Sequence, residues 1–199
     1  MIKLCVSSIL FLSLLHGYDA QHLAKAMDQK ECIGCDLRNA PMSKMDFSGA
    51  DFHGSNLSGA DVSGSSFEMG DFNDCNMSGV NAQNAIFWKA SIKNSDLRKL
   101  RASGANFKGA HFDGSDLSHA DMRDAKIWKA DFSDASFIQT NFQGSELGAS
   151  KFVRNDLRFA NFKNTLLWET HFRDTVMSKV QCKHAKKEEA IFDANVTCR

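Results

Sequence analysis

The chain has 199 residues and carries 24 basic and 24 acidic side chains, so its formal net charge at pH 7 is zero. This balance argues against the single-sign surface with which proteins bind nucleic acid, and a hydrophobic content of 43% excludes a disordered chain. The length suits one globular domain.

The first twenty residues are predicted to be a signal peptide. One lysine precedes an apolar run, Leu4 to Leu15, that is too short to cross a bilayer but suits a secretory signal. Two cleavage sites are open. Cleavage after Ala20 would place the bulky Tyr18 two residues earlier, where a small residue is preferred. Cleavage after Ala26 fits small residues but lies rather far downstream. Cys5 lies too early for a lipoprotein signal. We therefore expect an exported protein, periplasmic or secreted, without a transmembrane span after cleavage; a retained anchor is the alternative.

Residues 21–34 are expected to form an N-terminal cap. Gln21 to Glu31 place apolar residues among polar ones in a pattern typical of a short amphipathic helix. The following Cys32-Ile33-Gly34-Cys35 allows a redox or a metal interpretation. A redox motif needs an α/β context, however, and a structural zinc site needs four ligands, and neither is visible. We therefore prefer a structural use of these cysteines.

A period of five residues dominates the middle of the chain. From Leu37 to Met177 every fifth residue is apolar, and only Ala82 and Ala102 in this series are small. A small residue usually stands two places before the large one, and Asp or Asn often stands one place before it, where it favours a tight turn. This period belongs neither to a helix nor to a flat strand, so it indicates stacked short repeats around one continuous core.

The repeated unit, for example Ala50-Asp51-Phe52-His53-Gly54, resembles the pentapeptide-repeat family over about three quarters of the chain. The resemblance implies an all-β fold, a right-handed quadrilateral parallel β-helix with four pentapeptides per coil. Residues 35–182 would then form about seven coils at a spacing of ~4.8 Å. The family is mostly non-enzymatic. A Cys-x-x-Cys-Asp-Leu entry resembles the first turn of its exported members, which favours a capping role for Cys32 and Cys35.

Steps of twenty residues predict which side chains stack on each wall of such a coil. One wall is almost entirely aromatic and consists of Phe52, Phe72, Ile92, Phe112, Phe132, Phe152 and Phe172. The small centres Ala82 and Ala102 each follow an oversized residue, Val80 or Leu100, by two places. We expect these two large side chains to point inward and to fill the volume that the alanines leave.

A C-terminal cap is predicted over residues 183–199, because the five-residue frame breaks at Lys187. Residues 183–190 are rich in helix formers, and Ile191 and Phe192 return in phase. We therefore expect a short helix followed by a final segment tucked against the last coil.

The remaining cysteines fit an oxidising compartment, which permits disulfides. Cys182 and Cys198 bracket the C-terminal end and are candidates for a disulfide that closes it. Cys75 occupies a small inward position of the repeat and is expected to be a buried free thiol.

Outward positions must carry the function, because the inward ones are committed to packing. Trp88, Trp128 and Trp168 each follow a centre residue at intervals of forty, so we expect them on one wall about 10 Å apart. Together with Lys89 and Lys129 they form the candidate partner-binding surface, because exposed aromatic patches often mark binding sites. The alternative is that a duplication copied a tryptophan that only shields the wall.

No catalytic, cofactor-binding or metal-ligating set is predicted. The seven histidines are scattered, and His111 and His171, which share a wall, would be about 14 Å apart. That separation is too large for them to share a metal. Residues 21–80 hold four basic and nine acidic side chains, whereas residues 81–199 hold nineteen and fourteen. This asymmetry could steer a partner or favour a homodimer or end-to-end self-association, but basic residues lie on several walls and no nucleic-acid partner is expected.

These observations lead to the hypothesis of an exported, non-catalytic bacterial scaffold. Its outer walls would be presented to an unknown protein or envelope component. Two alternatives are open. One is a nucleic-acid mimic that protects topoisomerases, as the resemblance to the family suggests, although zero net charge and predicted export oppose it. The other is a passive structural protein that only self-associates.

Overall fold

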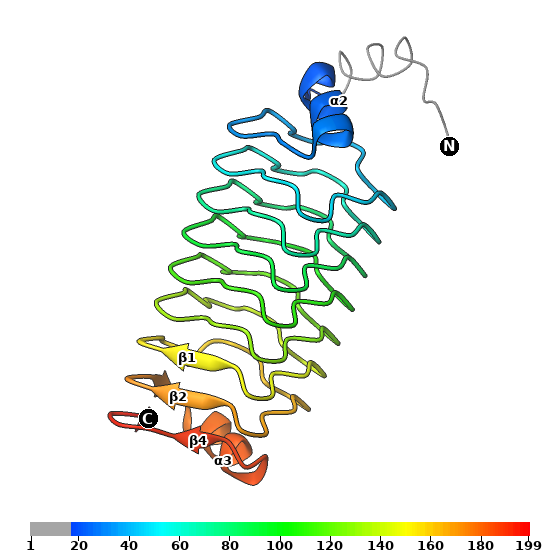
Figure 1. The fold of residues 1–199 in the computed structure, drawn as a ribbon. Helices are drawn as coiled ribbons and strands as arrows, with labels where there is room; N and C mark the ends of the chain where they lie inside the picture. Colours follow the sequence, from blue (N-terminus) through cyan, green and yellow to red (C-terminus); the bar gives the residue numbers. More distant parts are fainter. Residues whose placement is uncertain (1–16) are drawn as a thin grey trace.

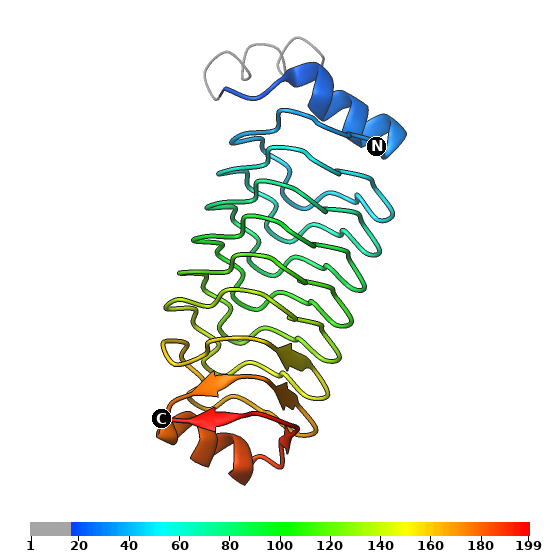
Figure 2. The ribbon, with the colours of Figure 1, turned by 90° about the vertical axis from the view of Figure 1, so that its left-hand side faces the viewer.

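The computed structural model describes residues 17–199, which form a rod of stacked coils with a helix at each end (Figure 1). Of the predicted signal peptide, residues 1–20, the first sixteen residues lie outside the described residues. Helix α2 (Ala20–Gln29) covers the first coil, and helix α3 (Lys179–Lys187) lies across the last one. A quarter turn about the vertical axis shows the coils stacked one above another from the first cap to the second (Figure 2).

Each coil has four sides, and each pentapeptide supplies one of them. Through most of the rod, parallel bridges join the residue before a centre to the residue twenty positions later, as in Asp51↔Asp71. Two backbone hydrogen bonds flank this bridge: Phe52 N donates to Asp71 O (2.8 Å), and Asp71 N donates to Ala50 O (3.0 Å). The twenty-residue step that we predicted from the sequence is thus the step of the coil.

The turns between sides explain the Asp and Asn residues of the repeat. The Asp51 carboxylate accepts a hydrogen bond from His53 N at 2.9 Å, and the next residue, Gly54, has a φ of +66°. Such left-handed conformations suit glycine, but Asn and Asp also tolerate them, as Asp74 does with a φ of 57°. The predicted bonding of these side chains to nearby backbone is confirmed.

The core is a column of stacked rings. On the predicted aromatic wall, the ring of Phe132 lies 4.8 Å from that of Phe112 and 5.0 Å from that of Phe152, centroid to centroid. A second ladder, which we did not single out, stacks Phe47, Phe67, Phe87 and Phe107 on a neighbouring wall.

The compensation predicted around the two small centres is also present. Val80, Leu100, Ala82 and Ala102 are all buried, with at most 1% of their surface exposed. The large side chains therefore point inward, into the space beside the alanines.

Inward hydroxyl groups form a ladder of hydrogen bonds that sequence reasoning missed. Each hydroxyl donates to the carbonyl of a centre residue 23 positions earlier, as Ser95 Oγ does to Phe72 O at 2.7 Å. Ser95 Oγ also accepts a hydrogen bond from Cys75 N at 3.1 Å. Donors of the same kind are Ser55, Ser65, Ser115, Thr140, Ser150, Thr165 and Thr170. The core therefore accepts these polar residues because the hydroxyls of the ladder satisfy backbone groups that the turns leave free. Two inward hydroxyls lie outside the ladder: Ser145 Oγ donates to Phe142 O, three positions earlier, and Thr175 Oγ1 has no partner among the described residues.

The N-terminal cap is helical as predicted, and the repeat begins earlier than expected. The Asp19 carboxylate caps helix α2 by accepting from Gln21 N at 2.8 Å. Glu31 already bridges to Asp51, so regular pairing starts at residue 31 and not at 35. The cause is that α2 ends at Gln29, which leaves the following residues free to pair.

The C-terminal helix begins at Lys179, four residues before the predicted start of the cap. Ser178 and Gln181 form a capping box that initiates the helix: Ser178 Oγ accepts from Gln181 N, and the Gln181 side chain accepts from Ser178 N. The repeat frame still holds at Met177, so periodicity alone could not reveal this start.

Short parallel strands complete the C-terminal end of the rod. β1 (Lys151–Val153), β2 (His171–Arg173) and β4 (Ile191–Phe192) form one sheet in that order, with Phe172 opposite Phe192. β3 (Val176–Met177) pairs with β5 (Thr197–Cys198). The predicted return of the chain to the frame at Phe192 is confirmed.

Among residues 17–199, four cysteines are disulfide-bonded, in the pairs Cys32–Cys35 and Cys182–Cys198, and Cys75 is a buried free thiol. Burial raises the pKa of Cys75 to about 12. Because the thiolate is the reactive form, we expect Cys75 in the folded protein to resist a thiol reagent at pH 8 and to react fully in guanidinium chloride. Titration of the native protein with a chromogenic disulfide reagent checks this, and full labelling without denaturation would contradict it.

Candidate interaction surface

The three tryptophans and the lysines that follow two of them are called the Trp wall here: Trp88, Trp128, Trp168, Lys89 and Lys129. Each tryptophan directly follows a buried centre residue, so its side chain leaves the coil on the outside. Trp168 is 47% exposed, whereas Trp88 and Trp128 are half-buried. Leu166, two residues before Trp168, is 54% exposed and extends the apolar surface at this end.

Two of the tryptophans meet. The ring centroids of Trp128 and Trp168 are 5.8 Å apart with a tilt of 48°, so the predicted spacing of about 10 Å is wrong for this pair. Gly148 lies one coil after Trp128, and a Cβ built on it would be 3.0 Å from Cζ2 of Trp128. The indole therefore lies against bare backbone, and this close approach lets it lean toward Trp168.

Trp88 stands apart from this pair. Lys108 occupies the wall position between Trp88 and Trp128, in place of a glycine. The Nζ of Lys89 lies 4.5 Å from the ring centroid of Trp88, a cation–π contact. Lys89 and Lys129 both take left-handed turn conformations, with φ of 55° and 57°. Trp128 and Trp168 are thus in contact with each other, whereas Trp88 contacts Lys89.

Replacing Gly148 by alanine should separate the tryptophan pair. The new methyl group would lie 3.0 to 3.2 Å from three atoms of the Trp128 ring, and this half-buried ring can move outward. We expect the near-ultraviolet circular dichroism of the folded protein to change. Lys108→Ala, at the equivalent wall position two coils earlier, is the matched control and should leave the spectrum unchanged. An unaltered spectrum in Gly148→Ala would show that the packing of the Trp128 and Trp168 rings does not depend on the glycine.

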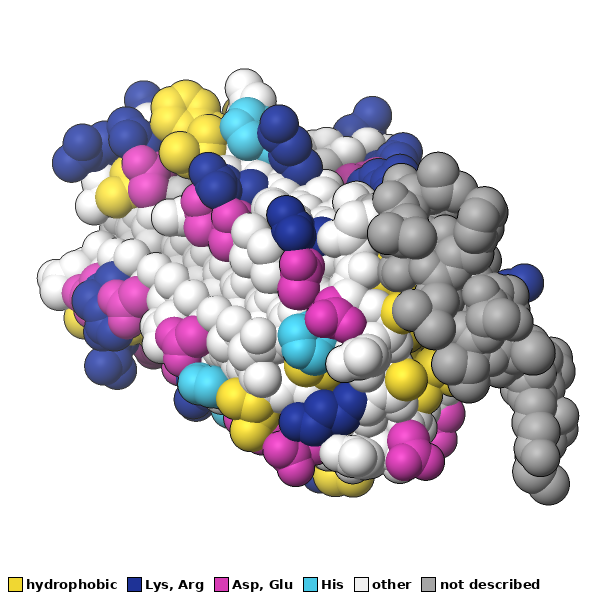
Figure 3. Space-filling view, turned by 90° about the horizontal axis from the view of Figure 1, so that it is seen from above, with side chains coloured by type: hydrophobic (Ala, Val, Ile, Leu, Met, Phe, Trp, Pro, Cys, Tyr) yellow, Lys and Arg dark blue, Asp and Glu magenta, His cyan; other side chains and the backbone are white. Residues whose placement is uncertain are grey.

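Aspartate–arginine pairs recur on the charged surface. Asp and Arg two residues apart form bidentate pairs, as in Asp121 with Arg123, where the Arg123 Nε and Oδ1 of Asp121 are 2.8 Å apart. The same pair recurs at Asp36–Arg38, Asp96–Arg98 and Asp156–Arg158. The side-chain hydrogen bond from Arg123 holds the pKa of Asp121 below its usual value. In the view from the N-terminal end, acidic and basic side chains are interspersed and neither sign of charge dominates (Figure 3).

Nothing in residues 17–199 gathers three or more histidine, cysteine or acidic side chains into a possible metal site. The same residues contain no helix that is long and apolar enough to cross a membrane.

A family model described as pentapeptide repeats matches in eight copies, over residues 31–68 and, in overlapping segments, 70–192. The chain belongs to the pentapeptide repeat family. Its repeat implies the right-handed quadrilateral β-helix whose four-sided coils are described above. Members of this pentapeptide repeat family are generally structural or non-catalytic. The search of curated proteins finds no significant match.

Several solved pentapeptide repeat structures are similar to this chain. HetL from the cyanobacterium Nostoc, which is involved in the regulation of heterocyst differentiation, is 16% identical over 75% of this chain and 93% of its own, with a TM-score of 0.28. Full-length QnrB1, a plasmid-mediated fluoroquinolone resistance protein, is 19% identical over 82% and 88%, with a TM-score of 0.38. A protein from the Arabidopsis thaliana thylakoid lumen is 18% identical over 73% and 77%, with a TM-score of 0.30.

Proposed function

We propose that this pentapeptide repeat protein is an exported, non-catalytic scaffold of about seven coils whose Trp wall binds a protein or an envelope component. The observation that carries the proposal is the contact between Trp128 and Trp168 beside the exposed Leu166. Tryptophan is enriched among the residues that dominate binding energy, and a packed, partly exposed pair offers a rigid apolar surface to a partner.

The two disulfides support export, because disulfides persist in oxidising compartments. The packing of the residues next to the predicted signal indicates where it would be cleaved. Tyr18 is only 5% exposed, and Asp19 caps helix α2. Cleavage after Ala20 or Ala26 would remove both. We therefore place the cleavage site before Tyr18, so that the mature chain keeps its N-terminal cap.

The mass of the mature protein tests export. A C-terminally tagged chain, produced in a bacterium and separated into cytosolic and envelope fractions, should leave the cytosol and begin at or shortly before Tyr18. A full-length cytosolic product would overturn export and return priority to the nucleic-acid mimic. That mimic needs a strongly acidic rod, whereas Asp36, Asp96, Asp121 and Asp156 are each paired with an arginine.

The double variant Trp128→Ala/Trp168→Ala tests the surface. We expect it to lose capture of partners from an envelope extract while its unfolding midpoint changes little. The matched control is Ile138→Ala/Phe159→Ala, which removes two other apolar side chains that are 56% and 63% exposed. If both variants capture the same partners as the parent, the Trp wall is not the binding surface, and if both lose them, the binding is not specific.

A further inference from the structure

The wall formed by residues 161–164 ends in an unpaired sheet edge. One coil earlier, Phe142 N donates to Asn161 O (2.9 Å) and Gly144 N donates to Lys163 O (3.0 Å). The equivalent N–H groups of the last coil belong to Phe162 and Asn164. Helix α3 replaces the next coil here and faces this edge across a groove, so these two N–H groups have no acceptor among residues 17–199.

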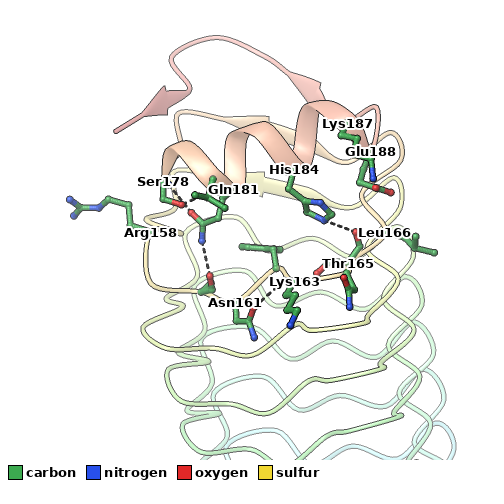
Figure 4. Close-up of a pocket in the computed structure, with 14 residues that line it drawn as sticks. Arg158, Asn161, Lys163, Thr165, Leu166, Ser178, Gln181, His184, Lys187 and Glu188 are labelled. Atoms are coloured by element: carbon green, nitrogen blue, oxygen red, sulfur yellow. Dashed lines mark hydrogen bonds between the residues drawn. The ribbon is translucent and has the colours of Figure 1, made fainter.

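Helix α3 satisfies the acceptors of this edge but not its donors. Gln181 Nε2 donates to Ala160 O at 2.7 Å, and His184 Nε2 lies 2.9 Å from Thr165 O. A further coil would bind these same two carbonyls, since Asn161 N donates to Thr140 O and Leu166 N donates to Ser145 O one coil earlier. Figure 4 shows Gln181 and His184 reaching from the helix to the coil beneath it. The edge that remains therefore presents N–H groups only.

A groove of about 780 Å³ runs between this edge and α3. Its apolar part includes Leu166 and Val180, which are 54% and 79% exposed. Lys163 and Lys187 line it and form no ion pair within the described part of the chain, and Glu188 is the acidic residue in its lining. Arg158 also lines the groove, but its guanidinium is held by Asp156 at 2.6 Å. The groove thus combines free backbone donors with two unpaired positive charges.

We propose that this groove binds an extended acidic peptide segment of a partner protein. The segment would add a strand parallel to residues 161–164, with two carbonyls, two residues apart in the peptide, accepting from Phe162 N and Asn164 N. Its acidic side chains would meet Lys163 and Lys187, so that the ligand supplies the acceptors and the negative charge that the groove lacks.

A second copy of the chain suits the groove less well than a separate peptide. In the acidic half, residues 21–80, helix α2 takes up the first residues and the chain from Glu31 onward is paired within its own coils, so this half offers no free extended segment. The groove shares Leu166 with the apolar surface beside the Trp wall, but its N–H groups and its lysines are not part of the Trp wall, so the proposal does not rest on that wall.

Amide hydrogen exchange of the full chain is the first test. Without ligand, Phe162 and Asn164 should exchange at least tenfold faster than Phe142 and Gly144, their paired equivalents one coil earlier. A fluorescein-labelled octapeptide of alternating Thr and Glu should slow exchange at Phe162 and Asn164 and leave the other two unchanged. Unchanged exchange at the edge in saturating peptide would overturn the proposal, as would equal binding of the alternating Thr–Lys peptide.

Two charge-reversal variants test whether the groove itself holds the peptide. Lys163→Glu/Lys187→Glu should weaken binding of the acidic octapeptide at least tenfold. Lys108→Glu/Lys183→Glu makes the same charge change at an equivalent repeat position and on the same helix, outside the groove lining, and should bind normally. Trp128→Ala/Trp168→Ala should also bind normally, so failure of the Trp wall leaves this result intact. Protection of the edge by concentration-dependent dimerisation, without peptide, would identify a second copy as the occupant and overturn the proposal.

Discussion

Replacing Phe132 by alanine should lower the free energy of unfolding by ~3–5 kcal/mol. The ring stacks between Phe112 and Phe152 and meets Phe137 edge-on at 5.5 Å. Removing it forfeits the transfer free energy of a fully buried ring and leaves a cavity between two coils. The backbone of those coils is hydrogen-bonded above and below, so it can collapse only in part. Urea unfolding followed by far-ultraviolet circular dichroism measures the loss.

Phe159→Ala is the control for this prediction. Phe159 lies outside the stacked rings and is 63% exposed, so its replacement should change the unfolding free energy by no more than about 0.5 kcal/mol. A loss of less than about 1 kcal/mol for Phe132→Ala, well under the expected range, would mean that the ladder repacks around the gap.

Removal of the disulfide in Cys182→Ala/Cys198→Ala should destabilise the C-terminal cap by ~3 kcal/mol. This disulfide joins residues that are 16 positions apart, and it ties the last strand, β5, to helix α3. Without the disulfide, the unfolded cap has more conformational entropy, because no closed loop restricts its chain. Hydrogen exchange of the α3 amides should show the loss directly, because the effect is local to the cap.

The other disulfide provides the comparison. Cys32 and Cys35 are only 3 positions apart, so Cys32→Ala/Cys35→Ala removes a much smaller loop and should cost less in chain entropy. Equal protection of the α3 amides in the parent and in Cys182→Ala/Cys198→Ala would show that packing alone holds the cap.

A tube with a committed interior leaves two kinds of surface for function. The side walls expose the residues that follow each centre residue, and the Trp wall is an apolar part of this exposed surface. Rod ends display the backbone edge, which α2 and α3 cover. At the C-terminal end this cover is incomplete, because Gln181 and His184 satisfy carbonyl groups while Phe162 and Asn164 keep free N–H groups.

The sequence by itself determined the interior of this protein. A coil of twenty residues returns every centre to the same wall, so Phe112, Phe132 and Phe152 could be stacked from their numbers alone, and Val80 could be placed beside Ala82. This works because each coil touches only its neighbours, and short-range periodicity therefore sets long-range contacts.

Only the tertiary structure decided how the outward side chains lie. The contact between Trp128 and Trp168 forms where the Trp128 ring lies against Gly148. A repeat period gives the position of each residue on a wall but not the orientation of its side chain. The start of α3 at Lys179 and the donor-only edge at Phe162 arise where the repeat stops and a helix competes with one more coil. Periodicity predicts positions along a regular lattice, and it loses that power at exposed surfaces and at ends, where side-chain freedom and capping hydrogen bonds determine the structure.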